Sequence, residues 1–510
     1  MSEQPTNTLA IKSRPRELSP GQVMGPGEAT IPGAGDTPLR FGVRGYLRLL
    51  RVATSFGVFG IRLLFNRRTW FRSSKTISEL RHREGAVLKD TLLSLGPTFI
   101  KIGQTLGTRA DILPTEYIQE LARLQDEVPT FPTQRAREII ERELHARIDD
   151  LFESFPDQPV ASASLGQVYR ARLRTGQVVA VKVQRPEIAG HIEFDIAVLR
   201  RIARLAERYP NLIRGVDWQG TLDEFRSHIF EELDYEQEAR NAEVFQKNFV
   251  RWKEVYVPRI HHLLSTRRVI VMEFIDGLKV SEVEQLTAAG HNPPEVVRLL
   301  ARTYLKQLLE DGFFHADPHP GNLRVMSDGR LAFFDFGMVG RLPMELQSQL
   351  INAFFHVVEH DVRGLVEDMV RLGFIDLSPD EEERFKPVIE ALFDRYLSLK
   401  LGDVQFKELI FDLAHVIYEF PFRIPANFTY IVRAIMTLEG LGTMVDSSFN
   451  FFEVARPYAK RFMFMREGRY LRGLIVDNVI RGKGGNIEWG KVWKLAKMAF
   501  KYYVRGENKL

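Results

Sequence analysis

Two short loops in the second half of the chain carry the side chains best suited to phosphate chemistry. In residues 315–322 (HADPHPGN) the carboxylate of Asp317 precedes the carboxamide of Asn322 by five positions. In residues 333–337 (FFDFG) the carboxylate belongs to Asp335. Oxygen ligands on loops suit Mg²⁺, which keeps waters and phosphate oxygens in its coordination shell. The two loops therefore predict a magnesium site for a phosphorylated ligand.

The same residues have simpler interpretations. Asp, Asn, Pro and Gly all favour turns, so each loop alone could be turn chemistry. His315 and His319 have the spacing of a helical metal pair, but the prolines at 318 and 320 argue against a helix and hence against zinc. The order of the motifs favours phosphate chemistry. A D-x-x-x-x-N followed by D-F-G has the spacing of the protein-kinase catalytic and metal loops.

A strand-like run upstream supplies a candidate phosphate ligand. Residues 179–182 (VAVK) resemble the kinase motif V-A-I-K, whose lysine contacts the α- and β-phosphates and is held by a carboxylate. We expect Glu238 to be that carboxylate. Taken alone, Lys182 is better explained as a strand residue that faces solvent, with its apolar neighbours forming the buried face.

The segment before that strand departs from ordinary protein kinases. The position of the G-x-G-x-x-G loop holds residues 159–168, which read PVASASLGQV. Backbone amides could still approach phosphate there, although each Cβ restricts φ and crowds the nucleotide. In addition, residues 337–347 hold no Ser, Thr or Tyr, so phosphorylation of this loop has no acceptor. The sequence therefore does not predict an ordinary protein kinase.

Taken together, these segments resemble the UbiB (AarF) family of atypical kinases, which is linked to quinone biosynthesis. Residues 101–104 (KIGQ) resemble its KxGQ motif, residues 161–168 its alanine-rich loop, and residues 232–234 (ELD) its ExD motif. The alanine-rich loop has Ser162 where alanine is usual. The resemblance implies a two-lobed kinase-like fold with a helical extension over the active site, and ATP and Mg²⁺ as cofactors.

The resemblance also implies roles for individual residues. The catalytic candidates are Asp317, Lys182, Glu238 and Lys101, and the metal candidates are Asn322 and Asp335. The nucleotide-binding candidates are Ala161, Ser162, Ala163, Ser164, Gly166, Val168, Lys182, Glu273 and Phe274. The family-motif residues are Lys101, Gly103, Gln104, Glu232 and Asp234. Lys101 is expected to face Glu232 where a peptide substrate would dock, and neighbouring carboxylates would keep this lysine charged.

The pattern of apolar residues divides the chain into six segments. Strand-like runs at residues 168–173 and 178–183 flank a turn and predict a hairpin, and residues 269–274 form a third such run. The predicted segments are a disordered arm (1–38), a basic amphipathic segment (39–84), the KxGQ extension (85–150), an N-lobe (151–278), a helical C-lobe (279–450) and a basic helical tail (451–510). The fold class is therefore α+β.

Composition excludes several classes of function. The chain has 510 residues, no cysteine and a net charge of +4. Disulfides, thiolate-ligated metals and a cysteine nucleophile are therefore excluded, and nothing in the overall charge indicates nucleic acid as a partner. The polar N-terminus lacks the apolar stretch of a signal peptide, and no apolar run approaches the ~18 residues of a spanning helix.

The charge distribution indicates an anionic membrane surface as a partner. Nine basic residues and no acidic one lie between Asp36 and Glu79. Arg44, Arg48 and Arg51 share one helical face, and such a helix can lie on a bilayer or pack on the rest of the protein. In the tail, Lys491, Lys494, Lys497 and Lys501 accompany Trp489 and Trp493, which also suits the lipid interface.

These observations lead to one prediction and two alternatives. The predicted protein binds Mg-ATP and hydrolyses it, or transfers phosphate to a small or isoprenoid-lipid acceptor, in support of isoprenoid-quinone biosynthesis. It would be cytoplasmic, peripheral on the inner face of the membrane, with quinone-biosynthesis enzymes as further partners. The alternatives are a non-catalytic, ATP-switched membrane scaffold and a true protein kinase.

Overall fold

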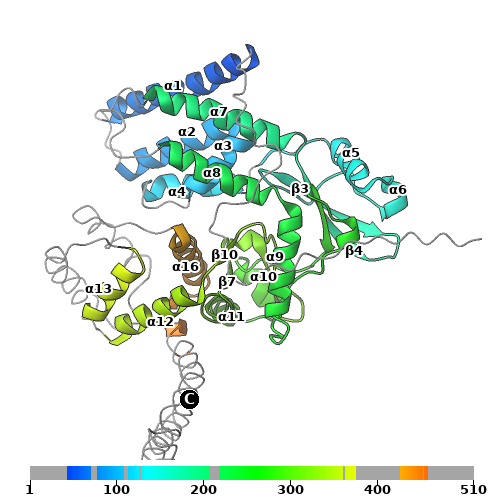
Figure 1. Cartoon of the computed structure of the whole chain (residues 1–510), viewed down its shortest axis with the longest axis vertical. Helices are drawn as coiled ribbons and strands as arrows, with labels where there is room; N and C mark the ends of the chain where they lie inside the picture. The colour runs from blue at the N-terminus through cyan, green and yellow to red at the C-terminus, as the bar shows by residue number, and fades with distance from the viewer. Residues whose placement is uncertain are drawn as a thin grey trace, which may run out of the picture.

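The computed structural model describes residues 43–70, 77–107, 113–125, 128–206, 218–359, 362–374, 426–451, 453–455 and 457. In these ranges a small strand-rich lobe and a larger, mostly helical lobe pack against a layer of long helices (Figure 1). This arrangement confirms the predicted α+β class with two lobes and a helical extension. The predicted arm 1–38 and the lysine-rich helix of the tail lie outside the described residues.

The small lobe is built on an antiparallel sheet in the order β1-β3-β4-β6, with β2 paired to β3. Its strands are β1 Phe152–Ser154, β2 Ala161–Ser162, β3 Gly166–Leu173, β4 Val178–Gln184 and β6 Val269–Glu273. The predicted hairpin is confirmed as β3 and β4. Its turn needs a glycine because Gly176 has a φ of +82°, a conformation that side chains with a Cβ rarely adopt.

Different helices pack on the two faces of this sheet. Val179, Val181 and Val183 alternate along β4 and pack under helix α5 Thr133–Leu144 and the short α6 Ile148–Leu151. Lys182 points to the opposite face, which helix α9 Tyr235–Asn248 covers. Helix α5 thus belongs with the small lobe, although the sequence placed residues 85–150 in the extension.

The larger lobe surrounds helix α11, whose Leu300 and Tyr304 are fully buried. Its helices are α10 Val283–Ala288, α11 Pro293–Lys306, α12 Met344–Glu359, α13 Val362–Arg371 and α16 Ala426–Val445, with a π-helical turn at Gln307–Asp311. Its short strands are β5 Val255–Tyr256, β7 Phe313–His315, β8 Leu323–Val325, β9 Leu331–Phe333 and β10 Val339–Arg341. The loops β7–β8 and β9–β10 carry the two predicted chemical motifs.

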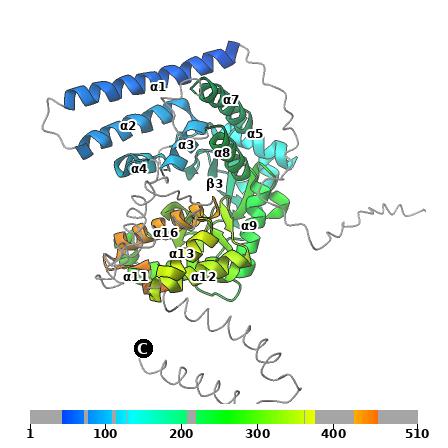
Figure 2. The same cartoon turned by 60° about the vertical axis from the view of Figure 1, so that its left-hand side comes forward.

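The layer of long helices combines two separate parts of the chain. Helices α1 Val43–Trp70, α2 Ile77–Leu95, α3 Pro97–Leu106 and α4 Thr115–Ala122 come from the N-terminal side. Helices α7 Ile188–Ala206 and α8 Trp218–Glu232 come from an insertion between β4 and α9. Both views show them stacked with α1 outermost (Figure 2). The boundary predicted between residues 84 and 85 falls inside α2.

Helix α1 meets the rest of the layer through both apolar and charged contacts. Val52 is completely buried in a cluster with Leu92, Phe99 and Val198. Arg48 faces the same way, with Nε 2.7 Å from Oδ1 of Asp195. Of the two alternatives for the basic face, packing on the rest of the protein therefore holds for Arg48, because this side chain is bound to Asp195. None of the helices in the described ranges has the length and apolar content needed to span a bilayer.

The Arg48–Asp195 pair should contribute to the stability of this layer. The Arg48→Met variant keeps the apolar stem but leaves the buried Asp195 carboxylate unpaired, so we expect a loss of about 2–4 kcal/mol in the free energy of unfolding. The double variant Arg48→Met, Asp195→Leu should recover most of that loss because no buried charge remains. Urea unfolding checks both, and an unchanged midpoint for Arg48→Met would contradict the assignment.

Candidate active site

Lys182 is at the centre of the site. Its Nζ lies 2.9 Å from both carboxylate oxygens of Glu238 and 3.2 Å from Oδ1 of Asp335. Glu238 is 1% exposed, whereas the Asp335 side chain is 45% exposed. The alternative of a solvent-facing Lys182 is thus excluded, and the predicted pairing with Glu238 is confirmed. The three residues join strand β4, helix α9 and the β9–β10 loop.

The charges of this cluster depend on one another. Burial alone would lower the pKa of Lys182, but the carboxylates of Asp335 and Glu238 raise it well above its ordinary value. Burial raises the pKa of Glu238 against the opposing effect of Lys182. For Asp335, partial burial is outweighed by Lys182 and His315, so its pKa is lowered. Lys182 therefore stays charged, and Asp335 is a partly exposed carboxylate.

The backbone around Asp335 is held in an unusual conformation. Asp335 has a φ of +54°, which is uncommon for a residue other than glycine and recurs at functional sites. The carboxamide of Asn241 on α9 donates to the Phe336 carbonyl at 2.9 Å. Asn241 thus ties the β9–β10 loop to the helix that carries Glu238, a contact that the sequence motifs did not reveal.

The β7–β8 loop holds Asp317 and Asn322 together. Nδ2 of Asn322 donates to the Asp317 carbonyl at 3.1 Å, which fixes the orientation of the carboxamide. His315 is fully buried; its Nδ1 accepts the Asp317 backbone N–H at 3.1 Å, and its Nε2 lies 2.9 Å from the Phe334 carbonyl. His315 therefore connects the β7–β8 and β9–β10 loops by hydrogen bonds. These bonds account for its place in the motif, and no metal ligation by its ring is needed.

Arg433 is a site residue that sequence reasoning missed. It lies on α16, and its guanidinium donates to Oδ1 of Asp317 at 2.8 Å. Burial alone would raise the pKa of Asp317, but Arg433, together with His315 and Lys101, lowers it. Tyr430 on the same helix hydrogen-bonds the ring of His228 on α8 at 2.8 Å. Helix α16 thus holds the Asp317 carboxylate ionised and also contacts the helical layer.

The KxGQ segment lies on α3 beside the site, and Lys101 faces Glu232 as predicted. Lys101 forms an ion pair with Glu232, and it also lowers the pKa of both Asp317 and Asp335 through its charge. Gln104 donates to the Leu124 carbonyl at 2.9 Å and accepts from the Ser164 hydroxyl at 3.2 Å. The family-motif residue Gly103 packs against Leu92 and Leu124, which leave no room for a Cβ.

The alanine-rich loop is a tight hairpin whose tip is buried. Ala161 and Ser162 pair with β3, and the Ala163 N–H donates to the Gly166 carbonyl at 2.8 Å. Leu165 packs among α7 and α8 residues. Arg185 donates to the Ala163 carbonyl at 3.0 Å. The helical layer therefore holds this loop in place, while Ala161 and Ala163 stay exposed.

The remaining predicted residues make contacts that belong to the helices and strands around the site. Asp234 caps α9, because its Oδ1 accepts the Gln237 N–H at 3.0 Å. Val168 lies opposite Lys182 across the β3–β4 pair. The Glu273 carboxylate accepts from the Tyr256 hydroxyl at 2.6 Å, and the Phe274 N–H donates to the Val178 carbonyl at 3.2 Å. These hydrogen bonds use the Glu273 side chain and the Phe274 amide within the protein.

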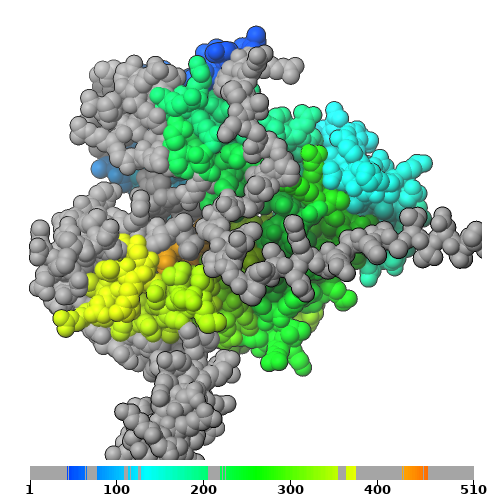
Figure 3. Space-filling view, viewed as in Figure 1, coloured from blue at the N-terminus to red at the C-terminus, as the bar shows by residue number. Residues whose placement is uncertain are grey.

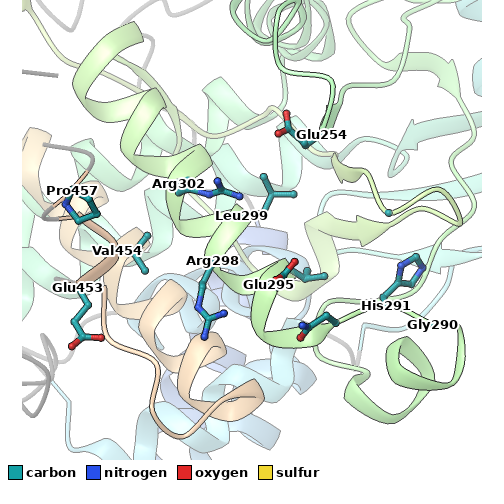
Figure 4. Close-up of a pocket in the computed structure, with 13 residues that line it drawn as sticks. Glu254, Gly290, His291, Glu295, Arg298, Leu299, Arg302, Glu453, Val454 and Pro457 are labelled. Atoms are coloured by element: carbon teal, nitrogen blue, oxygen red, sulfur yellow. The ribbon is translucent and has the colours of Figure 1, made fainter. Parts of the chain in front are cut away.

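A large cavity of about 940 Å³ contains none of these residues. It is lined by α11, by residues 290–292 and by Glu453, Val454 and Pro457, and Figure 4 shows its side chains. Arg298 and Arg302 enter it together with Glu254, Glu295 and Glu453. Guanidinium and carboxylate groups are mixed there, so the lining favours neither an anionic nor a cationic ligand.

The donor set fits magnesium held together with phosphates. Asp335 offers a partly exposed carboxylate, and Asn322 has its amide nitrogen bonded so that its oxygen is the group left for a metal. The described residues hold no cluster of three or more His, Asp or Glu that would bind a metal alone. Two protein ligands plus phosphate oxygens and waters are what Mg²⁺ commonly accepts.

The Ala163→Gly variant tests whether the alanine-rich loop contacts a nucleotide. Glycine widens the allowed φ and removes the exposed Cβ, so the backbone can approach phosphate more closely. We expect the affinities for Mg-ATP and Mg-ADP to shift severalfold, with autophosphorylation as a further readout. Calorimetric titration measures this, with Ala289→Gly as the matched control at an exposed alanine elsewhere. Unchanged affinities would show that this loop does not cover the phosphates.

Family models and known relatives agree on the affiliation of the chain. The ABC1 atypical kinase-like domain matches residues 123–369, and the UbiB helical domain matches residues 389–450. The uncharacterized protein sll1770 of Synechocystis is 40% identical over 80% of this chain and 70% of its own length. The uncharacterized protein slr1919 of the same organism is 37% identical over 89% of this chain and 78% of its own length.

A plant relative carries a functional name. The chloroplastic protein ACTIVITY OF BC1 COMPLEX KINASE 3 of Arabidopsis thaliana is 37% identical over 89% of this chain and 63% of its own length. A solved complex of Rv3197 with erythromycin, from Mycobacterium tuberculosis, aligns with a TM-score of 0.46 at 24% identity over 68% of this chain and 88% of that one. The family models and the identity to the Synechocystis and Arabidopsis proteins place this chain in the ABC1/UbiB family of atypical kinase-like proteins.

Proposed function

We propose that this protein binds Mg-ATP between its lobes and hydrolyses it, or transfers its γ-phosphate to a small or isoprenoid-lipid acceptor, in support of isoprenoid-quinone biosynthesis. The observation that carries the proposal is the contact of Lys182 with both Glu238 and Asp335. A lysine placed in this way can reach phosphates while a carboxylate beside it takes a metal. The quinone pathway itself rests on the family resemblance.

Each chemical group has a defined part in the proposed reaction. Asn322 and Asp335 would hold Mg²⁺, and the metal would neutralise charge on the phosphate oxygens. Lys182, oriented by Glu238, would bind the α- and β-phosphates. Asp317 would accept a hydrogen bond from the attacking hydroxyl or water and so orient it. Because Arg433 lowers the pKa of Asp317, this residue acts mainly by orientation and by its charge rather than as a strong base.

The helical layer disfavours a peptide as the acceptor. Lys101 and Glu232 form their ion pair beside the catalytic carboxylates, and Gln104 contacts the phosphate loop through Ser164. A peptide would have to displace these contacts to reach Asp317, whereas water or a small acceptor would not. These contacts favour hydrolysis or small-acceptor transfer over a true protein kinase.

Two substitutions separate nucleotide binding from turnover. Asp335→Asn removes a metal carboxylate, so we expect it to abolish magnesium-dependent stabilisation by ATP in a thermal-shift titration. Asp317→Asn keeps the metal ligands and should bind Mg-ATP normally while single-turnover hydrolysis falls by about 10²-fold or more. Equal hydrolysis by Asp317→Asn and the parent protein would favour the non-catalytic scaffold, and quinone profiling of a deletion strain tests the pathway.

The Arg433→Met variant should shift the acid limb of the pH–rate profile. Arg433 lowers the pKa of Asp317, so its removal raises that pKa and leaves the carboxyl protonated over more of the acidic range. The ionised form is the active one, and therefore we expect activity to be lost at a higher pH than in the parent. Affinity for Mg-ATP at neutral pH serves as the control. An acid limb at the parent position would argue against the role of Arg433.

A further inference from the structure

Helix α1 presents an exposed apolar stripe along its outer side. The members recur at steps of three, four or eight residues, so they share one face of the helix, and each is between 49% and 77% exposed: Val43, Leu47, Leu50, Val58, Ile61 and Phe65. At 1.5 Å per residue this outer stripe is about 33 Å long. The opposite side of α1, with Val52 and Arg48, is already packed on the protein.

The concentration of these side chains on one helix is unusual. Seven of the fourteen large apolar side chains exposed in the described ranges lie on α1. Single exposed apolar residues are normal, but a contiguous row of them marks an interaction surface. Helix α1 forms the outer margin of the helical layer in both cartoon views, and its first turns form the upper edge of the space-filling view (Figure 3).

Charge indicates what this stripe contacts. Nine basic residues and no acidic one lie between Asp36 and Glu79. Arg51 and Arg62 are exposed and, at 100° per residue, border the outer stripe on one side, and the Arg51 guanidinium also donates to the Ser94 carbonyl on α2 at 2.8 Å. A second copy packed through α1 would bring these like charges together. The arm 1–38 holds eleven Gly and Pro, so it is a poor source of a complementary apolar helix.

We propose that α1 lies flat on an anionic lipid bilayer, with the outer stripe inserted at the boundary between headgroups and acyl chains. Arg62 then lies at the depth of the lipid phosphates, where its charge adds to binding, and Arg51 adds its charge from the border between the stripe and α2. Apolar insertion supplies the part of the affinity that resists salt, and the arginines supply the part that salt removes. This assignment replaces the basic face expected from the sequence by an apolar one.

Vesicle flotation with the full chain tests the stripe. The variant Leu47→Gln, Leu50→Gln, Ile61→Gln removes apolar surface without changing charge, and we expect its partition onto phosphatidylglycerol-containing vesicles to fall by about tenfold or more. Leu263→Gln makes the same change at a leucine that is 97% exposed on the small lobe, and it should bind as the parent does. Parent-like flotation of the triple variant would overturn the proposal.

A fluorescence experiment gives an answer that does not depend on the folding of that triple variant. The chain has no cysteine, so Leu50→Cys or Leu263→Cys can be labelled selectively with an environment-sensitive dye. Anionic vesicles should shift the emission of the dye to the blue at position 50 and leave it unchanged at 263. An absent shift at 50, or an equal shift with phosphatidylcholine alone, would overturn an anionic bilayer as the occupant. If the parent protein is a dimer and the triple variant is a monomer, the stripe contacts a second copy of the chain and the bilayer proposal is overturned.

Discussion

The contact of Lys182 with Glu238 and Asp335 is the interaction on which the rest of the site depends. It joins three elements that lie far apart in the sequence, and each is held by further bonds. Strand β4 is fixed by its register with β3 and β6. Helix α9 begins at the Asp234 cap, and Asn241 ties it to the backbone beside Asp335. A shift of α9 would therefore move Lys182, Glu238 and the β9–β10 loop together.

The helical layer constrains the same site from the other side. Lys101 and Gln104 on α3 contact Glu232 and the alanine-rich loop, while Arg433 and Tyr430 on α16 contact Asp317 and α8. Phosphoryl chemistry depends mainly on fixed positions and fixed charges. In the proposed reaction, a site bounded in this way would admit water or a small acceptor more readily than a peptide, because a peptide would have to displace these contacts.

The sequence predicted the parts of the site that depend on short-range patterns. The β3–β4 hairpin follows from two strand-like runs around Gly176, and the pairing of Lys182 with Glu238 follows from motif spacing. Arg433 was missed because it meets Asp317 across 116 positions, and no local pattern marks a single arginine on a long helix. The orientation of α1 was left open for a similar reason. Both sides of that helix carry apolar residues, and the choice depends on Asp195, which lies 147 positions away.

The buried tip of the alanine-rich loop has a consequence for the rate of nucleotide exchange. In a kinase with a flexible glycine-rich loop, the loop can lift by itself and release the product. Here Leu165 is packed among helices α7 and α8, and Arg185 holds the Ala163 carbonyl. Departure of the proposed nucleotide would then require the small lobe and the helical layer to move as one body. Motions of two packed bodies occur on the microsecond to millisecond scale, so a nucleotide bound as proposed would exchange through that motion and not through lifting of the loop alone.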